Sequence, residues 1–156
     1  MKKYFIILPI IFFFFSCSKE MKNQDKINVD IQTGVLLTNQ QGENLLDPKT
    51  PGSYNDNDIY VFTLNKDGTQ TIIQKNLVRI SNTVSYFLYI NEFDLSRPDE
   101  NGFGESTVYL HLNDQNTDTI KVEYQFKGAT LSIIKLWYNS ELKWKIGSPR
   151  LIKIVK

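Results

Sequence analysis

Residues 106–126 of this 156-residue chain read STVYLHLNDQNTDTIKVEYQF. Apolar side chains occupy every second position on both sides of a turn rich in Asn and Asp, namely Val108, Leu110 and Leu112 before it and Ile120, Val122, Tyr124 and Phe126 after it. Because successive side chains of a strand point to opposite faces, this period of two predicts two strands, each with one buried face. The stretch therefore predicts a β-rich domain rather than a helical one.

The chain after residue 26 has the same character throughout. It is rich in Tyr, Phe, Ile, Val and Thr, poor in Ala, and shows no sustained helical period. Further strand-like segments are 27–32, 58–65, 69–75, 83–90, 131–138, 141–145 and 150–155. About eight to nine short strands at this spacing are typical of a sandwich or barrel. We expect an all-β fold, a β-sandwich of mostly antiparallel strands, over residues 27–156.

Turn-forming residues separate these segments. Asp67-Gly68 lies between two strand-like runs and predicts a hairpin, because Gly accepts the positive φ that the turn needs. Two longer stretches break the strand pattern with Pro and Gly, at residues 39–57 and 93–104, and these predict two extended loops.

The first residues have the pattern of a secretory signal peptide. Lys2 and Lys3 precede an apolar run over residues 4–15, and Ser16 ends the run. That run is shorter than the roughly 20 apolar residues that cross a bilayer. A charged start, a short apolar stretch and a small residue at its end predict a removable signal over residues 1–16.

The end of this segment, Phe14-Phe15-Ser16-Cys17, resembles a lipobox, the cleavage site of bacterial lipoproteins. Ser16 fits that motif, whereas Phe14 and Phe15 depart from its usual Leu followed by a small residue. The resemblance implies cleavage before Cys17, lipidation at Cys17, and a membrane partner reached through that anchor. The alternatives are an ordinary signal with a chance cysteine, or an uncleaved anchor helix.

Residues 18–26 are polar and without periodicity, so we expect 17–26 to form a lipidated N-terminus and flexible tether. By resemblance to lipoproteins of double-membrane bacteria, Ser18 directly after the cysteine suits sorting to the outer membrane. The pair Lys19-Glu20 only partly resembles the acidic cluster that sends some lipoproteins to the cell surface. The expected location is the cell envelope, and whether the domain faces the periplasm or the surface stays open.

Several segments of the domain resemble a family of Bacteroidetes-type lipoproteins of unknown function. The segments that carry the resemblance are 42–48, 50–55, 118–121 and 135–139. The resemblance implies an envelope location and a β-sandwich. It supplies no activity and no catalytic residues.

Charge and cysteine content narrow the classes of function. The formal net charge is +1, and it falls to about −1 when residues 1–16 are removed with Lys2 and Lys3. A near-neutral domain does not predict nucleic-acid binding, which usually needs a basic face. Cys17 is the only cysteine, so we expect no internal disulfide and no cysteine-based metal site. No cofactor is expected.

No catalytic set is expected either. His111 is the only histidine and falls on the face opposite Leu110, where it is expected to be a surface residue. No G-x-S-x-G motif accompanies it. Asp56 and Asp58 slightly resemble a calcium loop, but they lack its glycine and distal glutamate and fit an Asn- and Asp-rich turn better.

The aromatic side chains offer one candidate binding site. Trp137, Tyr138 and Trp144 lie in one short stretch, and Tyr109 is expected to point outward, so these four are possible glycan contacts. The alternative is that these rings pack in or beside the core.

The leading hypothesis is a lipid-anchored cell-envelope protein that acts as a non-enzymatic interaction module, with a protein or glycan partner. The second hypothesis is a glycan-binding accessory lipoprotein, and the weakest is a small envelope hydrolase.

Overall fold

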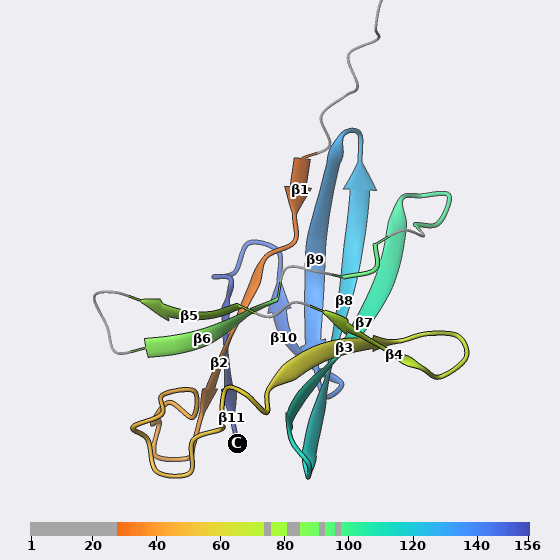
Figure 1. Cartoon of the computed structure of the whole chain (residues 1–156). Helices are drawn as coiled ribbons and strands as arrows, with labels where there is room; N and C mark the ends of the chain where they lie inside the picture. The colour runs from red at the N-terminus through yellow and green to blue at the C-terminus, as the bar shows by residue number, and fades with distance from the viewer. Residues whose placement is uncertain (1–27, 74–75, 81–84, 91–92, 96–97) are drawn as a thin grey trace, which may run out of the picture.

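The computed structural model describes residues 28–73, 76–80, 85–90, 93–95 and 98–156 (Figure 1). The predicted signal peptide and lipidated tether, Cys17 among them, lie outside the described residues. Within the described ranges every regular element is a strand, and no helix has the length and hydropathy needed to cross a membrane.

The described residues form eleven strands. In chain order they are β1 (Asn28–Asp30), β2 (Thr33–Thr38), β3 (Tyr60–Leu64), β4 (Gln70–Ile73), β5 (Asn76–Ile80), β6 (Ser85–Ile90), β7 (Phe103–Asn113), β8 (Asn116–Lys127), β9 (Thr130–Tyr138), β10 (Glu141–Lys145) and β11 (Leu151–Val155). The prediction of an all-β domain is confirmed. The expected eight to nine strands are too few.

The strands form a large and a small sheet. The large sheet has seven strands in the order β1-β9-β8-β7-β3-β4, with β10 also paired to β9, and the small sheet has the order β11-β2-β6-β5. Figure 1 shows β7, β8 and β9 as long upright strands, while β3 and β4 turn across their direction. The large sheet therefore curls, and its β3–β4 end diverges from the central strands.

The predicted hairpin at residues 106–126 lies at the centre of the large sheet. β7 and β8 pair antiparallel, with Val108 opposite Ile120 and Ser106 opposite Val122. The alternating apolar side chains of both strands are fully buried from Val108 to Leu112 and from Ile120 to Tyr124. Period-two alternation thus predicted both the strands and their buried face.

The small sheet covers this buried face. Its core residues Val35, Leu37, Ile152 and Ile154 belong to the same apolar cluster as the buried residues of β7 and β8. β2 pairs in parallel with β11, and β1 pairs in parallel with β9. The small sheet therefore joins strands from the two ends of the described chain, whereas β1 extends the large sheet beside β9.

The long connection between β2 and β3 is ordered, as expected for residues 39–57. The Asn44 side chain donates to the Tyr86 carbonyl at 2.8 Å, and the Leu45 amide donates to the Leu37 carbonyl at 2.9 Å. Leu45 and Leu46 are buried in the core. The loop is thus held by its own apolar anchors and closes one end of the domain.

Candidate functional site

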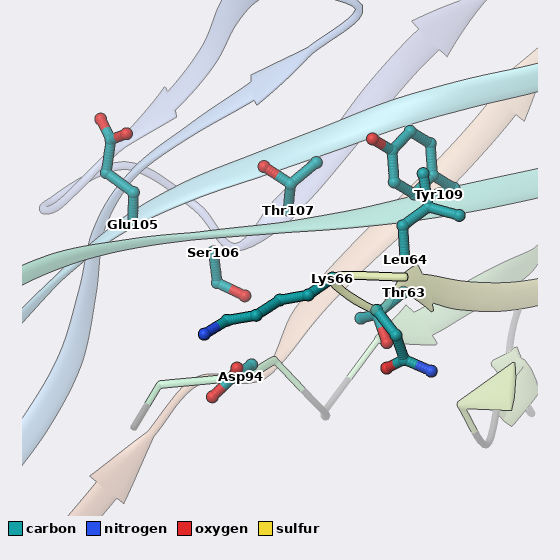
Figure 2. Close-up of a pocket in the computed structure, with 9 residues that line it drawn as sticks. Thr63, Leu64, Lys66, Asp94, Glu105, Ser106, Thr107 and Tyr109 are labelled. Carbon is teal, nitrogen blue, oxygen red and sulfur yellow. The ribbon is translucent and has the colours of Figure 1, made fainter. Parts of the chain in front are cut away.

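The candidate site is a hollow between the β3–β4 hairpin and the first half of β7. Within the described residues β3 pairs with β7 only where Tyr60–Phe62 face Tyr109–His111, and the strands diverge beyond Phe62. The divergence leaves an open space of about 580 Å³ (Figure 2). It is lined by Thr63, Leu64, Asn65, Lys66, Asp94, Glu105, Ser106, Thr107 and Tyr109.

One wall of the hollow is the turn between β3 and β4. Gly68 has a φ of 82°, as the predicted Asp67-Gly68 hairpin requires. The Thr69 hydroxyl donates to the Asp67 carboxylate at 2.7 Å, and the Thr69 amide donates to the same oxygen at 3.0 Å. These bonds from Thr69 hold the pKa of Asp67 below its ordinary value. The turn is fixed by its own side chains, so it places Lys66 and Asn65 beside the hollow.

The other wall is the β7 strand, and its lining is polar. Eight of the nine lining residues carry a polar or charged side chain. Figure 2 shows the Lys66 amino group extending between Ser106 and Asp94 on one side of β7, while Glu105, Thr107 and Tyr109 project from its other side, the outer face of the sheet. Glu105 pairs there with Lys121 at 2.8 Å, so its charge is already balanced. Such a lining suits a ligand with many hydrogen-bonding groups and few apolar ones.

Tyr109 belongs to a ladder of stacked rings on the outer face of the large sheet. Its ring stacks on Phe62 with centroids 5.2 Å apart, and His111 stacks on Tyr60 at 4.3 Å. Because Phe62 covers one face of the Tyr109 ring, only the other face is left for a ligand. His111 also contacts the Thr117 hydroxyl, with Nδ1 and Oγ1 3.3 Å apart.

Trp137 is half-buried on β9, and two cations flank it. The ammonium groups of Lys121 and Lys135 lie 5.5 and 5.9 Å from its ring centroid. Each cation–π contact at such an exposed site is worth about 0.5–1 kcal/mol. Lys135 also pairs with Glu123 at 2.9 Å. A sugar ring that stacked on Trp137 would have to compete with these neighbours.

The four predicted aromatic contacts do not form one platform. Tyr138 and Trp144 are only 3% and 7% exposed. The Tyr138 hydroxyl donates to Asp118, and the Trp144 indole N–H donates to the Ser148 carbonyl at 3.0 Å. Their assignment as glycan contacts is corrected, because both rings pack in the core, as the alternative interpretation held. A large aromatic residue in a strand more often faces the core than the solvent, and Tyr138 and Trp144 both do.

Tyr109 and Trp137 remain on the outer face, but on different strands. β8 separates β7 from β9, so their backbones lie about 10 Å apart across the sheet. Lys121 and Thr119 of β8 lie between them in the register. The structure thus leaves two separate aromatic positions, of which only Tyr109 borders the hollow.

Sequence reasoning missed a buried charged cluster around Asp118. Asp118 is 5% exposed and accepts hydrogen bonds from the Tyr138 hydroxyl and from the side-chain NH2 group of Asn139, each at 2.6 Å. It also pairs with the Lys156 ammonium group. A signal was present, because Asp118 occupies an apolar-face position two residues before Ile120, where a carboxylate needs partners. Asp118 also follows directly on the Asn- and Asp-rich turn between the two strands, where a carboxylate is an ordinary turn residue.

The charges and hydrogen bonds of this cluster stabilise the contact between the two sheets. Burial raises the pKa of Asp118, but the hydrogen bonds from Lys156, Tyr138 and Asn139 together with the Lys156 charge lower it below its ordinary value overall. Burial and the adjacent Asp118 carboxylate raise the pKa of Tyr138, and the same two causes raise that of Tyr54. Lys156 follows β11 of the small sheet and Asp118 begins the buried row of β8, so the pair joins the two sheets.

The acidic turn before β3 folds as an Asn-stabilised turn. The Asn57 amide donates to the Asn55 side chain at 3.1 Å, and the Asp58 amide donates to the Asn55 carbonyl at 3.0 Å. Among the residues that the structure describes, no three His, Cys, Asp or Glu side chains gather in a way that could hold a metal ion.

Comparisons of the chain with protein families, with curated proteins and with solved structures find no match. What the domain binds must therefore be inferred from its own surfaces. The two features of that surface are the open polar hollow and the ladder of stacked rings beside it, on a small all-β domain.

Proposed function

We propose that the chain is a lipid-anchored cell-envelope protein whose β-sandwich domain acts as a non-enzymatic interaction module. The observation that carries the proposal is the distance along the chain from the anchor to the domain. Cys17 follows the signal-like segment, and β1 begins at Asn28, eleven positions later. Such a segment spans at most about 40 Å when extended, so a domain that begins at Asn28 can fold outside the bilayer and stay tied to it.

The resemblance to Bacteroidetes-type lipoproteins and the serine after the cysteine support a place in the outer membrane. The interaction surface in this proposal is the side of the large sheet where β3 separates from β7. The polar hollow exposes the edge of a long central strand, and strand edges are surfaces on which partners often dock.

Lipid attachment is tested by replacing the anchor residue. Expressed with its signal segment in a double-membrane bacterium, the chain is expected in the membrane fraction, with an N-terminal acylated Cys17 in its mass spectrum. Cys17→Ala is expected to leave the domain folded but to move it to the soluble fraction, whereas Ser18→Ala serves as the matched control. Unchanged membrane association of Cys17→Ala would mean that the apolar segment, and not the cysteine, is the anchor.

A second candidate function is glycan binding, and the composition of the hollow favours it. The hydroxyl-bearing residues Thr63, Ser106, Thr107 and Tyr109 line a space of about 580 Å³, which is within the usual size of small-ligand sites. Tyr109 also supplies an aromatic ring, the kind of side chain on which a sugar can stack.

A glycan array with the purified domain tests this second candidate. Tyr109→Ala and Thr107→Ala are each expected to weaken binding at least tenfold, because both line the hollow. Trp137→Ala is the control, since Trp137 lies on β9 outside it. Binding that depends on Trp137 but not on Tyr109 would move the site to the Lys121 and Lys135 face, and binding to no glycan would leave the protein-partner proposal alone.

A further inference from the structure

The end of the large sheet next to β1 carries exposed apolar side chains. Val29 is 53% exposed and Phe126 38% exposed, and Leu131 between them is half-buried. Val29 pairs with Leu131 across β1 and β9, and Leu131 pairs with Phe126 across β9 and β8. Because directly paired residues share a face, the three side chains form one apolar row.

This row lies on the same face of the large sheet as the core residues, but outside the area that the small sheet covers. Two residues further along each strand, Tyr124 and Ile133 are buried on the same face and pair with one another. The long β8 thus extends past the residues that the small sheet covers, and Figure 1 shows its end rising above β2 and β6. The row is exposed because the second layer of the domain does not reach it.

The opposite face at this end is polar apart from one exposed aromatic residue, since its paired positions include Asp30, Ser132 and Gln125. Phe103 is 37% exposed and pairs with Gln125, the neighbour of Phe126 that points to the other side. Between the two faces the β8–β9 turn, residues 127–130, is fully exposed. The exposed apolar side chains thus lie close to the strand ends, with the row of Val29, Leu131 and Phe126 on one face and Phe103 on the other. A rim at the strand ends can enter the interface of a lipid layer end-on.

The chain itself brings this end to a membrane. β1 begins at Asn28 beside the β8–β9 turn, so the segment that leads back to Cys17 leaves the domain here (Figure 1). The opposite end, with the β7–β8 turn at residues 113–116, lies about 40 Å away along the twelve residues of β8. When Cys17 is acylated, the apolar end is the part of the domain nearest the bilayer.

We propose that the tether-end rim, defined as Val29, Phe103, Phe126 and Leu131, enters the interface of the bilayer that holds the lipid anchor. The proposal rests on the lipidation of Cys17 in the proposed function and adds a fixed orientation to it. Lys127 is exposed at this end, and so are Asp99 and Glu100, so the rim has no basic excess. The contact is therefore apolar, forms on zwitterionic lipid, and persists in high salt.

Depth-dependent quenching tests the orientation. The full lipidated chain is reconstituted into phosphatidylcholine vesicles that contain a spin-labelled lipid. One fluorophore is attached at Ala129→Cys in the β8–β9 turn, and another, in a separate sample, at Asp114→Cys in the distal turn, since the acylated Cys17 thiol is blocked. We expect at least threefold stronger quenching at position 129 than at 114, unchanged in 1 M salt, as expected for apolar contact.

The double variant Val29→Ser, Phe126→Ser is expected to reduce quenching at position 129 to the level at 114. Ile72→Ser, at another exposed apolar position, is the matched control and is expected to change nothing. Equal quenching at both labels in a chain that floats with the vesicles refutes the orientation alone. A wild-type chain that does not float has no anchor, which refutes the proposed function and this inference with it. Circular dichroism confirms that each variant is folded.

Discussion

Asp118 of β8 contacts Tyr138 at the end of β9 and Lys156 just after β11, so it joins the large sheet to the small sheet. Replacing Asp118 with Ala removes this acceptor. The Tyr138 hydroxyl is then buried without its 2.6 Å partner, which costs about 1–3 kcal/mol. Lys156 loses its counter-charge, but its side chain is 19% exposed and recovers part of its hydration. We therefore expect a loss of about 3 kcal/mol in the free energy of unfolding, the lower end of the range for broken buried ion pairs.

Thermal and urea unfolding followed by circular dichroism measure this loss. For a domain of this size, about 3 kcal/mol corresponds to a fall in Tm of about 10 °C. Asp118→Asn keeps an acceptor for Tyr138 and is expected to lose less. Asp114→Ala, in the exposed turn before β8, is the control and should stay within about 0.5 kcal/mol of wild type. Equal stability of Asp118→Ala and Asp114→Ala would refute the reasoning.

The same carboxylate makes the stability depend on pH. Its pKa is lower in the folded protein than the ordinary value of about 3.9, so folding favours the ionised form. The stabilisation that Asp118 contributes is therefore fully present at pH values above its ordinary pKa. It is lost as the pH falls through the lower pKa of the folded protein. The stability difference between wild type and Asp118→Asn should shrink from about pH 7 to about pH 2. A constant difference would contradict the assignment.

Three further substitutions test the packing by Tm. Gly104→Ala places its Cβ 2.3 Å from the buried ring of Tyr124 and is expected to cost about 1–3 kcal/mol. Gly34→Ala, whose nearest neighbour is the movable end of a side chain at 3.0 Å, should cost less, and the reverse order would contradict this packing. Ser140→Gly relieves a φ of 70° in the β9–β10 turn and should stabilise the domain by about 1 kcal/mol; a lower Tm would count against it. Trp144→Phe removes the indole hydrogen bond and should lower the free energy of unfolding by about 1 kcal/mol. Trp144→Ala also removes the ring and should lower it by about 3–5 kcal/mol. Similar losses for the two variants would mean that the ring does not fill the core.

Local pattern predicted most strands, and the long central strands β7 and β8 followed it most closely because each buries one face. All nine predicted segments overlap a strand, and Val108 and Ile120 lie on the buried face that their alternation predicted. β2 was not predicted, because Thr33–Thr38 is buried on both faces and its apolar residues are consecutive. β5 has three apolar residues in five without alternation, and it was not predicted either.

The candidate site depended on information that no local pattern contains. The outward position of Tyr109 followed from alternation, and the structure has it on the outer face. The hollow beside it arises because β3 leaves β7 after three residue pairs, and that register depends on the whole sheet. The Asp118 cluster likewise joins residues 20 and 38 positions apart, so alternation could place the carboxylate on the buried face but could not identify its partners.

The parallel pairing of β1 with β9 and of β2 with β11 also determines when the domain can fold. The Thr38 hydroxyl bonds to the Ile154 carbonyl, 116 residues later, so the small sheet is incomplete until the last strand is available. Contacts of such high sequence separation make folding slow and leave the emerging chain without its final core. We expect the small sheet to form only after synthesis has reached β11, so the complete fold appears late in the life of the emerging chain.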